Sequence, residues 1–192
     1  AIADRFAVWQ HKIRYSDLIL DDADDIYAEI RKHKQQRGQL FICSHLGNID
    51  VCRALVSHHQ GFKLNVLVYS RHAQAFNQAL KAAGASDIAL IQVNELDAGK
   101  MLELAQKLDR GEWIAIAADR IPVRGEKTVA VQFLRHTAHL PQGAWLMADL
   151  LKAKTNTIFV LKKNGRYHLE LRKFADIAHY KRGERDAHIA AR

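Results

Sequence analysis

Short apolar runs alternate with helical patterns along most of this chain, and this alternation restricts the possible folds more than any other feature. Runs of strand length occupy residues 39–44, 64–69, 88–93, 112–118 and 156–162. Patterns with helical spacing fall among them, at residues 48–59, 72–83, 97–109 and 142–153. Strands that take turns with helices are typical of a buried, largely parallel sheet whose faces are covered by helices. The sequence therefore predicts an α/β fold.

Two further patterns predict antiparallel pairing in addition. Residues 128–134 alternate apolar and polar side chains as a half-buried strand does. Asn164-Gly165 stands between two strand-like runs, and this dipeptide is the preferred turn of a two-residue hairpin. We therefore expect a mixed, mainly parallel sheet flanked by helices, with a terminal β-hairpin.

The domain organisation follows from length and pattern. A chain of 192 residues with 48% hydrophobic residues can bury a core of one domain. Residues 2–20 and 22–36 have helix-compatible spacing, and the second segment carries acids first and bases last, as a helix dipole favours. We expect a single domain over residues 1–192, with a helical lead-in at 1–37 and a core at 38–172. Because the chain begins with Ala1, an N-terminal segment is expected to be missing.

The charge balance favours an anionic partner. Lys and Arg number 29 against 21 Asp and Glu, which gives a net charge of +8. Nucleic acid, phospholipid headgroups, phosphorylated substrates and an acidic carrier protein all fit this charge. Trp9, Trp113 and Trp145 stand inside apolar patterns and do not alternate with bases, so nucleic acid is not expected. No apolar run approaches the roughly 18 residues that span a bilayer, so membrane contact is expected to be peripheral.

The stretch Ser44-His45-Leu46-Gly47-Asn48-Ile49-Asp50 interrupts an apolar run at a chemically important place. His45 follows the first predicted core strand, and Asp50 falls in the first turns of the next helix. Gly47 permits a sharp bend between them, and Asn48 is a suitable N-cap. In open parallel sheets, ligands bind beyond the carboxyl ends of the strands, which is where this stretch lies.

A histidine beside a carboxylate suits general-base catalysis. Imidazole titrates near neutral pH, and a carboxylate on one ring nitrogen fixes the tautomer and stabilises the protonated form. The five-residue spacing alone is weak evidence, because about one such His-to-Asp pair is expected by chance in a chain of this composition. A capping aspartate and a loop histidine bonded to backbone explain the spacing equally well.

The same residues carry a family resemblance. "SHLGNID" resembles the His-x4-Asp (HX4D) block of the lysophospholipid acyltransferase superfamily, closest to its bacterial lipid A late (lauroyl or myristoyl) acyltransferase branch. The rest of the chain agrees in order. Residues 66–85 resemble that branch's second block, and residues 108–153 resemble its third region. Residues 158–171 resemble its closing pair of strands. The branch's usual Asp-Gln reads Asp119-Arg120 here, and a Phe-Pro-Glu-Gly block is absent.

The resemblance implies transfer of a fatty acyl group from an acyl thioester, on acyl carrier protein or coenzyme A, to a hydroxyl of a lipid or glycolipid. His45 is then the general base and Asp50 its orienting acid. Asn48, Arg71, Asp119 and Arg120 are the expected substrate-binding residues. The resemblance further implies peripheral attachment to the anionic cytoplasmic face of the bacterial inner membrane. The acyl thioester is a co-substrate, and no cofactor or metal is expected.

Two other functions remain open on the sequence. A hydrolase or thioesterase using Cys43 or Ser44 with His45 is chemically feasible, although the Gly-x-Ser-x-Gly nucleophile motif does not occur. A non-enzymatic module that binds anions also fits the charge of the chain. A metal site is not expected, since the pairs His58-His59 and His136-x2-His139 have no Cys or carboxylate at ligand spacing.

Overall fold

The computed structural model describes residues 4, 7, 10, 12–59, 61–68, 88–120, 128–176 and 183–190. For residues 50, 53, 54, 57, 185, 186 and 190 the description covers the backbone and not the side chain. All structural statements below concern these residues.

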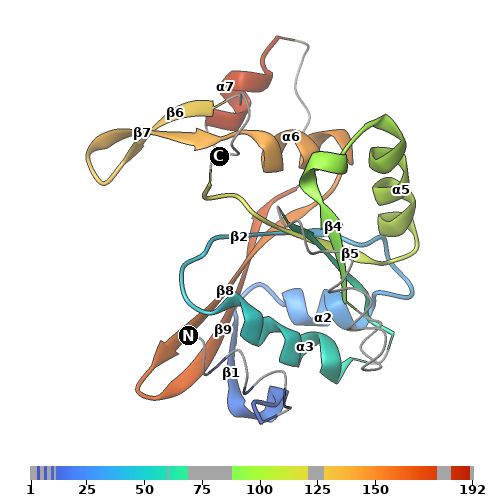
Figure 1. The fold of residues 1–192 in the computed structure, drawn as a ribbon, viewed down its shortest axis with the longest axis vertical. Coiled ribbons are helices and arrows are strands. Elements are labelled where there is room, and N and C mark those ends of the chain that lie inside the picture. Colours follow the sequence, from blue (N-terminus) through green and yellow to red (C-terminus); the bar gives the residue numbers. More distant parts are fainter. Residues whose placement is uncertain are drawn as a thin grey trace.

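A seven-stranded sheet forms the centre of the molecule (Figure 1). Its strands, in spatial order, are β1 (Leu18–Asp22), β9 (Arg166–Ala175), β8 (Thr155–Lys163), β2 (Leu40–Cys43), β5 (Trp113–Ala117), β3 (Leu64–Val68) and β4 (Ile88–Gln92). Neighbouring strands run parallel except β8 and β9, which form an antiparallel hairpin with its turn at Asn164 and Gly165. The predicted α/β fold, with a mixed, mainly parallel sheet and a terminal hairpin, is confirmed.

Helices cover both faces of this sheet (Figure 1). α2 (Ile26–Arg31) and α3 (Arg53–His58) lie on one face, and α5 (Ala98–Asp109) and α6 (Gly143–Leu150) lie on the other. A last short helix, α7 (Arg185–Ala190), contacts a separate two-stranded hairpin. The described residues also include three 3-10 turns, at Tyr15–Asp17, Ile49–Cys52 and Val93–Glu95.

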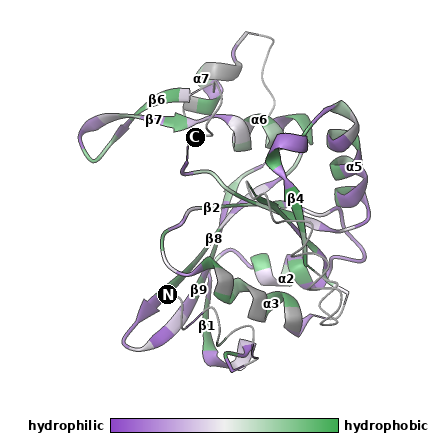
Figure 2. Cartoon of the chain, in the orientation of Figure 1, coloured by the Kyte–Doolittle hydropathy of each residue, from purple (hydrophilic) through white to green (hydrophobic). Residues whose placement is uncertain are grey.

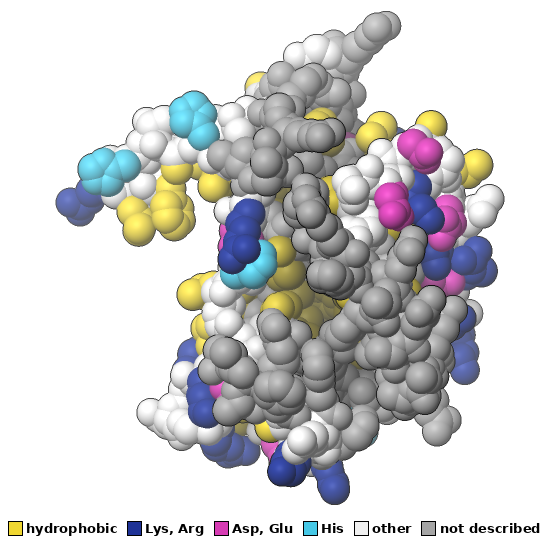
Figure 3. Space-filling view, viewed as in Figure 1, with side chains coloured by type: hydrophobic (Ala, Val, Ile, Leu, Met, Phe, Trp, Pro, Cys, Tyr) yellow, Lys and Arg dark blue, Asp and Glu magenta, His cyan; other side chains and the backbone are white. Residues whose placement is uncertain are grey.

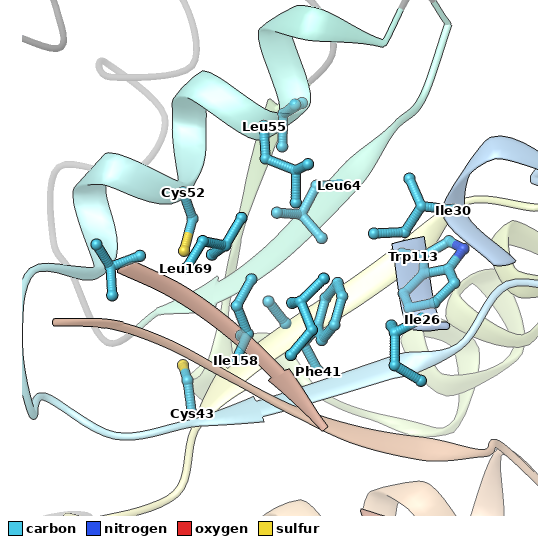
Figure 4. Close-up of a cluster of buried hydrophobic side chains, with 14 of the residues drawn as sticks. Ile26, Ile30, Phe41, Cys43, Cys52, Leu55, Leu64, Trp113, Ile158 and Leu169 are labelled. Carbon is cyan, nitrogen blue, oxygen red and sulfur yellow. The ribbon is translucent and has the colours of Figure 1, made fainter. Parts of the chain in front are cut away.

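Successive side chains of β2 enter two different cores, as the two-residue period of a strand requires. Phe41 and Cys43 pack under α2 and α3, in the cluster drawn in Figure 4. Leu40 and Ile42 pack against α5 and α6 on the opposite face. A strand buried on both faces must be apolar throughout, which is why these strands read as continuous hydrophobic runs (Figure 2).

The ends of α5 show how local sequence sets the boundaries. Asp97 caps its N-terminus by accepting a hydrogen bond of 2.7 Å from the Lys100 N–H. Gly111 follows its C-terminus with φ +82°, and a Cβ there would stand 1.7 Å from the His33 carbonyl oxygen. Only glycine fits both demands, so α5 ends just before this residue.

Two element predictions need correction. Helical spacing was expected through residue 36, but Leu18–Asp22 forms β1, which pairs in parallel with β9. This tertiary pairing outweighs the local pattern, and Asp22 then caps α2 by accepting from the Ile26 and Tyr27 N–H groups at 2.8 and 2.6 Å. The helix expected over 48–59 is a 3-10 turn followed by the short α3. The helix predicted at 72–83 lies outside the described residues.

A second, two-stranded sheet extends from the body of the molecule (Figure 1). It consists of β6 (Thr128–Phe133) and β7 (His136–Pro141), paired antiparallel. The strand predicted at 128–134 is thus confirmed, while its partner β7 was not predicted. The chain returns from this hairpin directly into α6.

Candidate active site

The carboxyl ends of β2 and β5 define the candidate site. These neighbouring parallel strands are in register at Cys43 and Ala117, and the Ala118 N–H donates to the Cys43 carbonyl at 2.9 Å. Two residues beyond each strand come His45 and Asp119. Because both loops leave the sheet at the same level, these two side chains meet at the edge where ligands bind in open parallel sheets.

His45 and Asp119 are joined by two sets of hydrogen bonds. Nδ1 of His45 lies 2.9 Å from Oδ1 of Asp119 and 3.2 Å from Oδ2. The backbone N–H of His45 also donates to Oδ2 at 3.0 Å. An ionised carboxylate only accepts, so it holds the proton on Nδ1 and leaves Nε2 as the unprotonated nitrogen of a neutral imidazole. The ring is therefore presented in the tautomer that a general base requires.

The charge state of Asp119 follows from these contacts. Partial burial, the largest influence, raises the pKa of this carboxyl, but the hydrogen bonds from the His45 backbone and imidazole together outweigh it. The net effect is a pKa below the ordinary value of an aspartate. Both side chains remain accessible, with 47% of His45 and 34% of Asp119 exposed. The pair is thus an ionised carboxylate and an imidazole that a substrate can reach.

The loop that carries His45 is fixed to strand β8. Gly47 forms a parallel bridge with Val160, and the Asn48 N–H donates to the Val160 carbonyl at 2.9 Å. Gly47 has φ +81°, and a Cβ at this position would stand 2.1 Å from the same carbonyl oxygen. No side chain fits there, so the bend that the sequence assigned to Gly47 is a steric requirement.

The other predicted site residues have different positions. Asn48 is half-buried beside the Gly47 bridge, and its side-chain amide nitrogen is buried. Asp50 lies in the 3-10 turn Ile49–Cys52, and its side chain is not among those described. Arg120 is exposed next to Asp119. Arg71 lies outside the described residues. Among the described side chains, the structure therefore joins His45 to Asp119, with Asn48 and Arg120 as chain neighbours.

Neither of the alternative nucleophiles is presented as an activated group. Cys43 is a free, buried cysteine of the core. Burial, with a further contribution from the charge of Asp119, raises the pKa of its thiol to about 12, so it stays protonated at neutral pH. Ser44 uses its Oγ to accept a hydrogen bond of 3.1 Å from the Leu46 N–H. These contacts give the hydrolase alternative no support.

Apolar surface lies close to the pair. Leu46, the residue after His45, is 63% exposed. On the face seen in Figure 3, hydrophobic side chains line the side of the β6–β7 hairpin that faces the body, and others are visible in a hollow of the body itself. An apolar side chain held in water beside this histidine suits a ligand with a hydrocarbon part.

The histidine pairs considered for metal are engaged otherwise. The His58 ring stacks on Tyr15 with 4.4 Å between ring centroids. His136 and His139 are three residues apart on β7 and hence point to opposite faces of the hairpin. Within the described part of the chain, no group of three or more His, Cys, Asp or Glu side chains has the arrangement of a metal site.

Comparison with known families decides the class of protein. The sequence profile of the bacterial lipid A biosynthesis acyltransferases matches residues 20–191. The chain belongs to this family. Membership confirms the resemblance carried by "SHLGNID" and implies an acyltransferase that acts on lipid, in a family that is membrane-associated. No individually curated protein matches the chain. None of the helices described in this acyltransferase combines the length and apolar character needed to cross a bilayer.

The pairing of Asp119 with His45 is the feature of this candidate site that sequence reasoning missed. Asp119 was expected at the substrate-binding edge, not on the histidine. A signal existed, since each residue stands two positions after a strand. Using it required knowing that β2 and β5 are neighbours, although about 70 residues separate them in the sequence.

Proposed function

We propose that this protein transfers a fatty acyl group from an acyl thioester, on acyl carrier protein or coenzyme A, to a hydroxyl of a lipid or glycolipid acceptor. His45 acts as the general base. The observation that carries the proposal is the 2.9 Å contact between His45 Nδ1 and the Asp119 carboxylate, in a chain of the lipid A acyltransferase family.

The reaction follows from this geometry. Nε2 of His45 removes the proton of the acceptor hydroxyl while the oxygen attacks the thioester carbonyl. The tetrahedral intermediate collapses by breaking the C–S bond, and the imidazolium returns its proton to the leaving thiolate. The net products are an ester and a free thiol. An acyl thioester is already activated, so no covalent acyl-enzyme is needed.

A carboxylate stabilises the imidazolium that forms during this step. The family resemblance implies Asp50 in this role, whereas the described contacts support Asp119, which already faces Nδ1. In the proposed mechanism Asp119 positions the ring and opposes its developing charge. Asp50, in the 3-10 turn after the loop, is retained as a second candidate that mutation can separate from the first.

The oxyanion of the intermediate requires donors. Two backbone donors of the loop are already engaged, since the Leu46 N–H binds Ser44 Oγ and the Asn48 N–H binds Val160. This supports the exposed guanidinium of Arg120 for the oxyanion or for a substrate phosphate. Arg71 is proposed as a further substrate-binding residue from its place in the family pattern.

The proposed setting is the cytoplasmic face of the bacterial inner membrane. The excess of basic residues supports peripheral attachment to an anionic lipid surface, and it equally suits an acidic acyl carrier protein. We propose no metal or further cofactor and no nucleic-acid partner. The lipid acceptor and the acyl thioester are the two substrates.

The test uses the His45→Ala variant in an assay that follows free thiol released from lauroyl thioesters of acyl carrier protein and of coenzyme A. The acceptor is lipid extracted from cells that lack the protein. We expect acceptor-dependent thiol release to fall by a factor of about 10² to 10⁴ with an unchanged melting temperature. His139→Ala, which removes another exposed histidine, is the matched control. Full activity of His45→Ala contradicts the proposal, and a covalent acyl adduct or acceptor-independent hydrolysis by the wild type supports the hydrolase alternative instead.

A further inference from the structure

The β6–β7 hairpin is amphipathic. In an antiparallel pair, opposed residues share a face and successive residues alternate between faces. One face therefore carries mainly apolar side chains, at positions Val129, Val131, Phe133, Ala138 and Leu140, with His136 at its outer end. The opposite face carries mostly polar ones, and its Gln132 and Thr137 side chains are hydrogen-bonded to each other at 3.0 Å. The hairpin thus presents an apolar face that is half-buried at Val129 and Val131, on the strand that α7 contacts, and exposed at Phe133.

Exposure of this apolar surface is greatest at the tip of the hairpin. Phe133 is 58% exposed, and Leu134 is 78% exposed, the highest value among the large hydrophobic side chains of the described residues. Leu140, nearer the base, is 38% exposed. The exposure of the large apolar side chains therefore increases toward the tip of the hairpin.

The turn at the tip of the β6–β7 hairpin has a backbone conformation that is unfavourable for the residues that occupy it. Leu134 and Arg135 have φ values of 51° and 68°, the left-handed conformation at both central positions. The turn of the β8–β9 hairpin has the same conformation, with φ values of 51° and 79°, but it uses the favoured Asn164 and Gly165. A bulky leucine at positive φ is strained, so its place at the tip calls for an explanation other than turn stability.

Positive charge accompanies the apolar tip. Arg135 is exposed at the turn, and His136 is exposed beside it. Arg166 is exposed at the tip of the second hairpin, beside Lys162 and Lys163, which form ion pairs with Asp4 and Glu170. Figure 1 shows both hairpin tips and the loop between β2 and α3 extending toward the same side of the molecule, the left of the view. The loop that carries His45 therefore opens on the side where basic and apolar tips are presented.

We propose that the tip formed by Phe133, Leu134 and Arg135 inserts into the headgroup region of an anionic bilayer and docks the protein on it. The aromatic and aliphatic side chains enter the boundary of the acyl chains, and the guanidinium of Arg135 pairs with lipid phosphates. Docking in this way keeps the His45 loop on the membrane side, where a lipid hydroxyl is presented. This last consequence rests on the proposed acyl transfer, while the docking itself does not.

The test measures binding to vesicles directly. Sedimentation with vesicles of phosphatidylethanolamine and phosphatidylglycerol is compared with sedimentation with phosphatidylcholine vesicles, for wild type and Leu134→Asn. Asparagine is polar and accepts the left-handed conformation. We therefore expect Leu134→Asn to bind anionic vesicles about tenfold more weakly while its melting temperature stays equal to or above that of the wild type. Loss of binding together with a gain in stability is not explained by misfolding.

Two controls separate the tip from general hydrophobicity and charge. Leu102→Gln removes another leucine, 61% exposed, from α5 and is expected to bind vesicles as the wild type does. Arg135→Asn keeps a residue that tolerates positive φ and is expected to lose the preference for anionic over zwitterionic vesicles. His45→Ala is expected to bind vesicles normally, so that failure of acyl transfer and failure of docking are seen separately.

The outcomes are decisive in each direction. Wild-type protein that fails to bind anionic vesicles, or a Leu134→Asn variant that binds them like the wild type, overturns the proposal. Self-association of the wild type that Leu134→Asn abolishes, without vesicle binding, shows that the tip joins two copies of the chain and also overturns it. Weakened binding by Leu134→Asn but not by Leu102→Gln establishes the tip as the docking element.

Discussion

The imidazole of His45 and the carboxylate of Asp119 face each other across the ends of two neighbouring parallel strands, with 2.9 Å between Nδ1 and Oδ1. The contact depends on the register of β2 and β5, which places Cys43 opposite Ala117. A second bond, from the His45 backbone N–H to Oδ2, fixes the carboxylate itself. The orientation of the His45 ring is therefore set by the sheet itself.

Replacing this carboxylate tests its role. In Asp119→Asn the negative charge that stabilises the imidazolium is lost, and an amide that donates toward Nδ1 favours the wrong tautomer. We expect kcat to fall by about 10²-fold or more with little change in melting temperature. The pH dependence of kcat is expected to shift as well, which loss of a merely structural contact does not produce.

Asp50→Asn is the matched variant for the same measurement, since it makes the same change at the carboxylate implied by the family pattern. If the wild-type rate and pH profile persist in Asp119→Asn and are lost in Asp50→Asn, the orienting role belongs to Asp50. Equal losses in both variants indicate that the two carboxylates act together, in which case the double variant loses little more than either single one.

Substitution of Gly47 tests whether the loop must be held against β8. Gly47→Ala introduces a Cβ only 2.1 Å from the Val160 carbonyl oxygen at a residue with φ +81°, so the backbone on both sides of Asn48 has to move. We expect at least about 1–2 kcal/mol of lost stability from the conformation alone, and a larger loss of activity because His45 shifts. Denaturant unfolding and kcat/KM measured on the same preparation check this.

Gly165→Ala is the control for that experiment. Gly165 has nearly the same backbone conformation, φ +79°, but no atom lies within 4 Å of a Cβ built there. This variant is expected to lose a similar amount of stability from strain and to keep its activity. A Gly47→Ala variant that behaves like Gly165→Ala shows that the bridge to Val160 does not position the base.

The comparison of two hairpins shows what local sequence predicts and what it does not. The β8–β9 hairpin was predicted because Asn164-Gly165 is a turn signal that works through backbone preference. The β6–β7 hairpin has a turn with the same signs of φ at Leu134 and Arg135, which give no such signal. Its second strand was therefore missed. Local rules fail at the turn for which we propose a function.

What could not be predicted of the sheet and of the site has another cause, which is pairing between strands that are distant in the sequence. Strands such as β2 and β5 were predictable because burial on both faces demands continuous apolar runs. β1 is short and half-buried, and it becomes a strand only by pairing with β9, some 150 residues later. The position of His45 at a strand end was equally predictable. Its contact with Asp119 depends on strand order, which no local pattern encodes.

Removal of the Cys43 thiol tests the alternative nucleophile. The pKa of Cys43 is raised to about 12, chiefly by burial, so Cys43→Ala is expected to retain acceptor-dependent acyl transfer. Its cost is a small cavity in the core, about 1 kcal/mol in the free energy of unfolding. Intact-mass measurement of the wild type during turnover is expected to show no acyl adduct. Inactivity of Cys43→Ala with such an adduct on the wild type assigns covalent catalysis to the thiol.

The buried carboxylate of Glu112 makes the free energy of unfolding depend on pH. Glu112 lies at the opposite end of β5 from the candidate site. Burial is the largest influence and raises the pKa of Glu112. Oε2 of Glu112 accepts a hydrogen bond from Asn65 at 3.0 Å, and Oε1 accepts one from Arg110 at 3.0 Å. Together with the nearby charge of Lys107, these bonds outweigh the effect of burial and lower the pKa overall. A depressed pKa means that the folded state binds the proton less readily than the unfolded state. Glu112 therefore contributes stability above the ordinary glutamate pKa, and this contribution is lost as the pH falls through the lower pKa of the folded state.

Glu112→Gln isolates this contribution because the amide keeps the shape and removes the charge. At pH 7 we expect the free energy of unfolding to drop by about 1.5–3 kcal/mol, the range for hydrogen bonds to a charged group. Below the folded-state pKa the wild-type carboxyl is protonated, and the difference between the two proteins should nearly vanish. Urea unfolding at a series of pH values downward from 7 follows this difference, and a gap that does not narrow as the carboxyl becomes protonated contradicts the assignment. Acyl transfer at pH 7 is expected to be retained, because Glu112 precedes β5 whereas Asp119 follows it.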